Sequence, residues 1–256
     1  MASERRLTAA ALRERKGAAF PVVTAYDAPF ARCAEAAGID VILVGDSLGM
    51  VVLGYPSTAP VELSDMQRHG AAVERGTSRA HIIVDLPFGT YEASDSEAVR
   101  SSVALVKAGG AGSVKLEGGV RAEARIRAIV AAGIPVVGHI GVLPQTAGLG
   151  GGFRRRRDRE LLLADAHAVA SAGASAVVLE MVDAAIAAEI TQALPIPTIG
   201  IGAGPSCDGQ VLVLHDVLGL YPESPPFARR FVDLSAVATS ALSEFATAVR
   251  DRSFPG

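Results

Sequence analysis

The sequence predicts an α/β protein folded as a (β/α)8 barrel, and three observations support this. Its length of 256 residues suits one such barrel, which typically needs about 250. Half of the residues are apolar but only 5% are aromatic, and a core of Ala, Val, Leu and Ile is typical of a parallel sheet covered by helices. Eight short apolar runs alternate with Ala-rich stretches of helical character, which is the pattern of parallel strand–helix units.

The eight predicted strands are β-branched, almost uncharged in their interiors, and end at turns or polar residues. In chain order they span 21–26, 41–46, 82–86, 113–117, 135–140, 176–181, 197–201 and 210–215. The seventh unit is irregular, because a Gly-rich turn between Ile201 and Gln210 leaves no room for a full helix. An open sheet of six to eight strands is the rival architecture. The barrel is favoured because the strand count reaches eight and no GxGxxG motif follows the first strand.

The predicted helices are Ala-rich, and several are followed by a glycine that indicates a helix end. They span 28–37, 62–75, 94–108, 120–132, 159–172 and 184–193, and the glycines are Gly38, Gly76, Gly109, Gly133 and Gly173. Residues 7–16 are predicted to form a short helix that closes the barrel bottom, and 235–250 a final amphipathic helix. Because no linker or repeat interrupts the pattern, we expect one domain over 1–256.

Charge and cysteine usage restrict the class of protein. A formal net charge of −3 favours neither nucleic acid nor an anionic membrane as a partner. No uncharged apolar stretch approaches the length of a membrane span, and the charged segment from Met1 to Arg15 lacks the apolar core of a secretory signal. Cys33 and Cys207 are the only cysteines and form no CxxC pair. We therefore expect a cytoplasmic protein without disulfides.

Four predicted strands end on ionisable residues, and in a parallel barrel catalytic groups gather at such ends. They are Asp46, Asp85, the pair Lys115 and Glu117, and Glu180. Four carboxylates brought together repel one another unless a cation lies among them. Mg2+ binds through one or two carboxylates and keeps several waters, so Asp46 and Asp85 suit it, with Glu117 as a third ligand. The sequence thus predicts a metal-assisted enzyme.

Lys115 and Glu117 alternate with apolar residues, which places both on one face of their strand. If that face looks into the barrel, the ammonium could bind an anionic substrate or offset the carboxylates. It could also serve as a Schiff-base lysine, or form a buried ion pair with no catalytic role, which is costly.

Further polar residues follow later strands. His139, at the end of the fifth strand, is either a structural histidine or a polar contact in the site. Glu180 ends the sixth strand after three apolar residues, and poor solvation there suits a general base. The segment 200–204 could present backbone amides to an anion or simply form a tight turn. The four arginines 154–157 form either a solvated charge run or a contact for an anionic, polyglutamate-like tail.

Several segments, in the same order along the chain, resemble motifs of the ketopantoate (3-methyl-2-oxobutanoate) hydroxymethyltransferase family. The resemblance extends from about residue 7 to residue 250. The matching segments are TAYD at 24–27, VGDSLGM at 44–50, DLPF at 85–88, VKLEGG at 114–119, GHIG at 138–141, GIGAG at 200–204, DGQ at 208–210, HD at 215–216 and LG at 218–219.

The resemblance implies a TIM barrel of the phosphoenolpyruvate/pyruvate superfamily type that binds Mg2+ and assembles as a decamer of two pentameric rings. It also implies an activity: transfer of a hydroxymethyl group from 5,10-methylenetetrahydrofolate to 3-methyl-2-oxobutanoate. A metal-stabilised enolate would attack the one-carbon unit and give 2-dehydropantoate (ketopantoate) for pantothenate and coenzyme A biosynthesis.

The resemblance also assigns roles at matching positions. It makes Asp46 and Asp85 metal ligands, with Glu117 close to the ion, and makes Glu180 the proton acceptor. Lys115 would neutralise substrate charge and His139 would hold the substrate or polarise one of its oxygens. The substrate contacts are Asp46, Ser47, Asp85 and Lys115.

One segment departs from the family pattern. Where the family has a loop of the type Gly-Gly-Tyr-x-Val-Gln-Gly, residues 151–158 read GGFRRRRD. This change leaves open a hydroxymethyltransferase, or a Mg2+-dependent aldolase or lyase, that acts on a different 2-oxo acid. No Lys-x-Cys-Gly-His-type motif of the isocitrate lyase-like barrels occurs, and no cluster residue is missing, as an inactive homologue would require. Mg2+, Mn2+ and Co2+ all accept these oxygen ligands.

Overall fold

The computed structural model describes residues 6–148, 152–221 and 224–255. The chain divides into two compact units, Met1–Val211 and Leu212–Gly256. The first unit carries every residue predicted for the site. The single domain expected over 1–256 stays a prediction.

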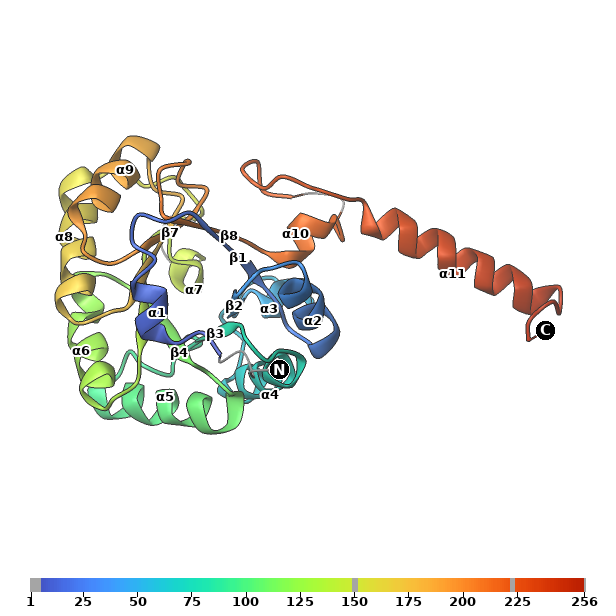
Figure 1. The fold of residues 1–256 in the computed structure, drawn as a ribbon, viewed down its shortest axis with the longest axis horizontal. Coiled ribbons are helices and arrows are strands. Elements are labelled where there is room, and N and C mark those ends of the chain that lie inside the picture. The colour runs from blue at the N-terminus through green and yellow to red at the C-terminus, as the bar shows by residue number, and fades with distance from the viewer. Residues whose placement is uncertain (1–5, 149–151, 222–223, 256) are drawn as a thin grey trace, which may run out of the picture. The chain divides into compact units, whose positions relative to one another are not determined.

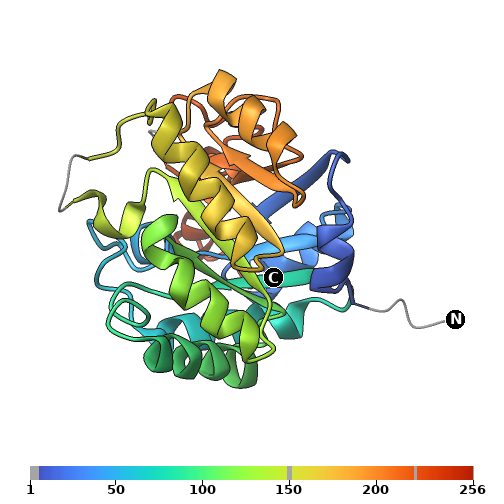
Figure 2. The ribbon, with the colours of Figure 1, turned by 90° about the vertical axis from the view of Figure 1, so that its left-hand side faces the viewer.

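The centre of the fold is a closed barrel of eight parallel strands in the order β1 to β8, which confirms the predicted fold class (Figures 1 and 2). All eight strands overlap the ranges predicted from the sequence. Their bounds are β1 (Phe20–Thr24), β2 (Val41–Val44), β3 (His81–Asp85), β4 (Ser113–Glu117), β5 (Val136–Gly141), β6 (Ala176–Glu180), β7 (Thr198–Ile201) and β8 (Gly209–Leu212).

Helices follow the strands and surround the barrel (Figure 1). Several begin at a capping residue whose side chain accepts a backbone N–H of the first turn, such as Asp27, Ser94 and Asp158. As predicted, no helix separates β7 from β8. The bounds are α2 (Ala28–Ala36), α3 (Leu48–Val51), α4 (Leu63–Gly76), α5 (Asp95–Gly109), α6 (Glu123–Ala131), α7 (Pro144–Ala147), α8 (Arg159–Ser171) and α9 (Ala184–Ala193). A 3-10 turn, η1 (Val120–Ala122), replaces the start of the α-helix that the sequence predicted over 120–132.

Two of the glycines predicted to end helices have a different role. Gly76 and Gly109 are the last residues of α4 and α5 rather than residues beyond them. A Cβ at Gly76 would lie 2.6 Å from the carbonyl oxygen of Ala28, and one at Gly70 would lie 2.4 Å from that of Gly109. Gly76 and Gly70 are therefore needed because neighbouring helices approach closely, whereas Gly38, with φ of +83°, does end its helix in the left-handed region.

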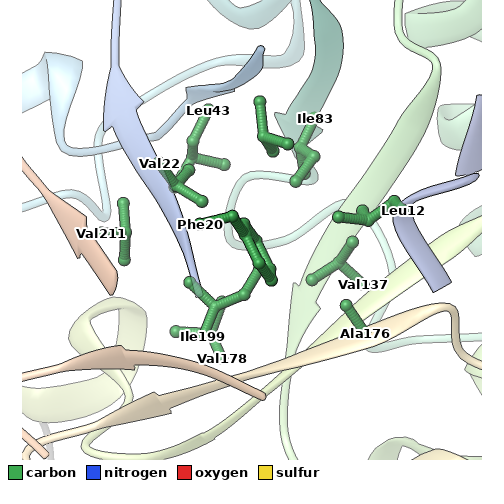
Figure 3. Packing of buried hydrophobic residues seen from close by; sticks show 11 residues of the cluster. Leu12, Phe20, Val22, Leu43, Ile83, Val137, Ala176, Val178, Ile199 and Val211 are labelled. Carbon is green, nitrogen blue, oxygen red and sulfur yellow. The ribbon is translucent and has the colours of Figure 1, made fainter. Parts of the chain in front are cut away.

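The N-terminal end of the barrel is closed by α1 (Ala9–Arg13), as the sequence predicted for residues 7–16. Leu12 is fully buried and belongs to a cluster with Phe20 and the first inward residues of several strands (Figure 3). Asp208 adds a polar clamp at this end: its carboxylate accepts hydrogen bonds from Gly17 N (2.8 Å) and Thr198 N (2.8 Å) and pairs with Lys16 Nζ at 3.0 Å.

The second unit contains α10 (Leu214–Leu218) and α11 (Leu234–Arg250). Inside it, Phe231 N donates to Val217 O at 2.9 Å. The predicted final helix is present, and none of its residues is buried. Within the described parts of the chain, no helix has the length and apolar character needed to cross a membrane.

Candidate active site

The ionisable strand ends predicted from the sequence meet at the C-terminal end of the barrel. Asp85 lies opposite Lys115 in the pairing of β3 with β4, and Glu117 lies opposite His139 in the pairing of β4 with β5. Parallel strands present the same end to the same side of the barrel, so residues far apart in sequence converge there. All four of these residues are buried, with at most 5% of each exposed.

Asp46 and Asp85 are held together by backbone geometry. Asp46 follows β2, and its backbone N–H donates to Asp85 Oδ2 at 3.1 Å. Burial and the neighbouring Asp85 carboxylate raise the pKa of Asp46 to about 7. Burial, followed by the charge of Asp46, also raises the pKa of Glu117 well above its usual value. Without a bound cation, the protein therefore has an excess of negative charge around Asp46, Asp85 and Glu117.

Lys115 is the one ammonium among these carboxylates. Its Nζ lies 3.0 Å from Asp85 Oδ1. Burial works to lower the pKa of Lys115, but the charges of Asp85 and Asp46 outweigh it and keep the pKa above its usual value. A Schiff-base lysine must lose its proton before it attacks, so the structure favours the charge-neutralising alternative for Lys115.

His139 connects Lys115 to Glu180. Its Nδ1 lies 3.3 Å from Lys115 Nζ, and its Nε2 lies 3.3 Å from Glu180 Oε2. Burial, followed by the positive charge of Lys115, lowers the pKa of His139 below its usual value, which makes the ring neutral at pH 7. An ammonium has only donors, so Nδ1 must accept and the ring proton must lie on Nε2, facing Glu180.

Glu180 ends β6 and is the most accessible of the four carboxylates, with 15% of its side chain exposed. The side chains of Asp85 and Glu117 are only 3% and 2% exposed. A carboxylate that reaches both the solvent and the site can accept a proton and later release it. The position of Glu180 thus suits the general base predicted from the sequence.

Gln145, which the sequence analysis did not single out as functional, lies at the centre of the polar network. Its Nε2 donates to Asp46 Oδ2 (2.7 Å) and Leu86 O (2.8 Å), and its backbone N–H donates to Glu117 Oε2 (3.2 Å). It is placed by α7, which begins at Pro144 directly after β5. A polar residue so soon after a barrel strand was the available signal in the sequence.

Two tyrosines complete the surroundings of the carboxylates. Tyr91 donates its hydroxyl hydrogen to Gln145 Oε1 at 2.6 Å and accepts from Glu117 N at 3.3 Å. Tyr26 lies 2.9 Å from Ser47, oxygen to oxygen, which orients the serine predicted to contact substrate. Burial raises the pKa of both tyrosines above the usual value, so both remain neutral hydroxyls.

A divalent cation fits this chemistry. Asp85 Oδ1 is buried and pairs with Lys115 Nζ at 3.0 Å, but among the described residues it accepts no hydrogen bond of good geometry, which leaves a lone pair for another ligand. Within the described ranges, no group of three or more His, Cys, Asp or Glu side chains is arranged to hold a metal ion. Mg2+ is commonly bound by only one or two carboxylates, with waters and substrate oxygens completing its coordination. Asp46 and Asp85 are the residues that would hold it.

The two loop motifs have separate positions. In the turn that contains residues 200–204, Gly202 and Gly204 have φ of +61° and +84°, which supports the tight turn as its role; anion binding there stays a prediction. Arg156 pairs with Val182 just beyond β6. This contact places the arginine run at the C-terminal end of the barrel, where the carboxylates are.

Fold and site together define a (β/α)8-barrel enzyme with a buried acidic centre. The ketopantoate hydroxymethyltransferase family model matches residues 6–256, and the chain belongs to this family. It is 52% identical over 246 residues to the 3-methyl-2-oxobutanoate hydroxymethyltransferase of Ignicoccus hospitalis, covering 94% of this chain and 93% of that protein. The Thermus thermophilus enzyme of the same name is 49% identical over 256 residues, covering 98% of each chain.

A solved structure supports the fold. Phosphoenolpyruvate phosphomutase from Streptomyces platensis subsp. rosaceus superposes with a TM-score of 0.66 at 18% identity, covering 95% of this chain and 88% of that one. The barrel is therefore shared with phosphoenolpyruvate mutase-type enzymes.

Proposed function

We propose that the protein transfers a hydroxymethyl group from 5,10-methylenetetrahydrofolate to 3-methyl-2-oxobutanoate and so forms 2-dehydropantoate for pantothenate and coenzyme A biosynthesis. The observation that carries the proposal is the arrangement of Asp46, Asp85 and Lys115 beside Glu180 in one barrel end. Relatives about half identical over nearly the full length carry the matching enzyme name.

Substrate binding follows from the charges of the site. A 2-oxo acid carries a carboxylate beside a keto oxygen, and the ammonium of Lys115 offers it a positive charge. Mg2+ held by Asp46 and Asp85, with Glu117 close to it, would supply further positive charge beside those oxygens and make the C3 proton easier to remove. Ser47, oriented by Tyr26, is placed to donate a hydrogen bond to the same acid.

Proton transfer follows from the position of Glu180. Its carboxylate takes the C3 proton, and C3 forms a new bond to the one-carbon unit of the folate. Water supplies the hydroxyl group, both carbon–nitrogen bonds that join the one-carbon unit to N5 and N10 of the carrier break, and each nitrogen receives one proton, one originating from C3 and one from water. His139 Nε2 lies 3.3 Å from Glu180 Oε2, so the ring proton is directed toward the carboxylate that takes up the C3 proton.

The test is direct turnover. Purified protein with Mg2+, 5,10-methylenetetrahydrofolate and 3-methyl-2-oxobutanoate should yield 2-dehydropantoate, identified by mass and by proton NMR. Absence of product with Mg2+, Mn2+ and Co2+ would overturn the proposal. A panel of other 2-oxo acids, with and without folate, separates a changed acid preference from a folate-independent aldolase or lyase.

We further propose that the protein works in the cytoplasm as a decamer of two pentameric rings. The support is the family resemblance and, for the compartment, the absence of a disulfide between Cys33 and Cys207, both free in the described chain. Sedimentation velocity checks the assembly: a species of about ten chains is expected, and a stable monomer contradicts it.

A further inference from the structure

The arginine run 154–157 is fixed beside the strand that carries Glu180. Arg156 N donates to Met181 O at 2.8 Å, and Asp183 N donates to Arg156 O at 2.9 Å. Met181 directly follows Glu180, the last residue of β6. The two bonds therefore hold a short piece of the loop beside the chain just beyond the end of β6. The run is therefore attached to the rim of the active site.

Arg155 is the residue that anchors the run. Its Nη1 donates to Val182 O at 3.0 Å and to Gly202 O at 2.8 Å. These carbonyls follow β6 and β7, so a single guanidinium connects two adjacent strand ends. Arg155 is thus occupied by the protein itself.

Arg154 and Arg157 remain available to a ligand. Both are exposed, and Arg154 forms no ion pair in the described parts of the chain. Arg157 approaches Asp183 only at 3.9 Å, with 75% of its side chain exposed, and such pairs contribute little. Two exposed guanidinium groups three positions apart in the run, only one of which has a carboxylate within 4 Å, favour binding of an anion with several negative charges.

The centre of the site has the opposite sign, with four carboxylates and a single ammonium. A polyanionic substrate would be repelled by this centre unless its charged part stayed at the rim. On the basis of the function proposed above, we propose that Arg154 and Arg157 bind the γ-linked glutamate tail of the folate. Each added glutamate brings one more carboxylate, and the planar guanidinium binds carboxylates in bidentate geometry.

The experiment compares tetrahydrofolate carrying one glutamate with tetrahydrofolate carrying five. Binding is measured by calorimetry without the oxo acid, and the KM of the methylene forms is measured separately. The variants are Arg154→Gln with Arg157→Gln, and a control, Arg32→Gln with Arg100→Gln, which removes two exposed arginines from α2 and α5. Both double variants change the net charge equally.

In the wild type, the pentaglutamate form should bind several-fold to about tenfold more tightly, the range expected for two exposed charge pairs. The advantage should shrink at high salt and disappear in the rim variant, while the control keeps it. Equal affinity for both forms in the wild type, or equal losses in both variants, would overturn the inference. If the inference fails but turnover with the monoglutamate form is normal, the proposed function still holds. If neither folate form is turned over, the proposed function is wrong as well.

Discussion

The side-chain amide of Gln145 donates a 2.7 Å hydrogen bond to the carboxylate of Asp46, a residue 99 positions earlier in the chain. The same NH2 group donates to Leu86 O, and the amide oxygen accepts from Tyr91. Two acceptors on one side and a donor on the other allow only one orientation of the amide. Gln145 therefore fixes the orientation of the Asp46 carboxylate.

Replacing Gln145 by Met keeps the volume but removes these hydrogen bonds. We expect a 10- to 100-fold loss of metal affinity, the usual effect of removing a partner that orients a ligand. Mn2+ binding measured by electron paramagnetic resonance checks this. Gln67→Met is the matched control, because in the described parts of the chain the Gln67 side chain makes only a long 3.4 Å bond to Ala104 O, outside the site. Unchanged Mn2+ affinity in Gln145→Met would contradict the positioning role.

Replacing Glu180 by Gln should abolish exchange of the substrate C3 proton. Loss of a general base typically costs a factor of about 10² to 10⁴. The measurement is deuterium incorporation at C3 of 3-methyl-2-oxobutanoate in D2O, followed by proton NMR with Mg2+ and without folate. Mn2+ affinity should stay within about twofold of the wild type, since Glu180 is not a proposed ligand. Undiminished exchange would remove Glu180 from its role.

The stability of the metal-free protein should depend on pH through Asp46. Its pKa is about 7 in the folded protein and near 4 in an unfolded chain, so the folded state holds a proton that the unfolded state releases. The contribution of protonated Asp46 to the free energy of unfolding is complete below about pH 4 and is lost as the pH rises through about 7. Glu117, whose pKa is also raised, acts in the same direction.

Thermal unfolding with and without Mg2+ checks this dependence. The increase in Tm on adding Mg2+ should be larger at pH 8 than at pH 6, because the ion offsets the ionised carboxylates. In Asp46→Asn both the pH dependence and the Mg2+ effect should weaken. A Mg2+ effect that is equal at both pH values would speak against this linkage.

Asp208→Ala should destabilise the protein by about 2–4 kcal/mol, because it leaves the N–H groups of Gly17 and Thr198 without their acceptor and removes the ion pair with Lys16, which still donates to Thr191 O. Burial by itself raises the pKa of Asp208, but the hydrogen bonds from Thr198 and Gly17 outweigh this effect and lower the pKa below its usual value. The clamp therefore stabilises the fold above the pKa of the unfolded chain and is lost as the pH falls through the lowered value.

Urea unfolding at pH 7 and at acidic pH measures both effects of the clamp. Mn2+ affinity should not change in Asp208→Ala, since Asp208 lies at the other end of the barrel from Asp46. A variant as stable as the wild type at pH 7 would show that the clamp contributes nothing.

The strands and most residues of the candidate site were predictable because each has a local signature. A run such as Val41–Val44 is buried on both sides and is followed by Asp46. Because parallel strand ends converge at one end of the barrel, Asp46 could be predicted to lie beside the other strand-end acids. Gly76 shows the limit of local signals: it resembles a helix stop, yet its contact with Ala28 exists only once two helices pack. Gln145 is similar, because nothing nearby in sequence indicates Asp46 as its partner.

By itself the sequence determined the barrel, the order of its units and the set of acids at its strand ends, because periodicity and residue type act over a few neighbouring positions. The tertiary structure decided the pKa of Asp46, the charged state of Lys115, the tautomer of His139 and the central place of Gln145. These properties depend on burial and on distances of a few ångströms between residues far apart in the chain. Electrostatic energies change steeply over such distances in a poorly solvated interior, so only the folded arrangement sets them.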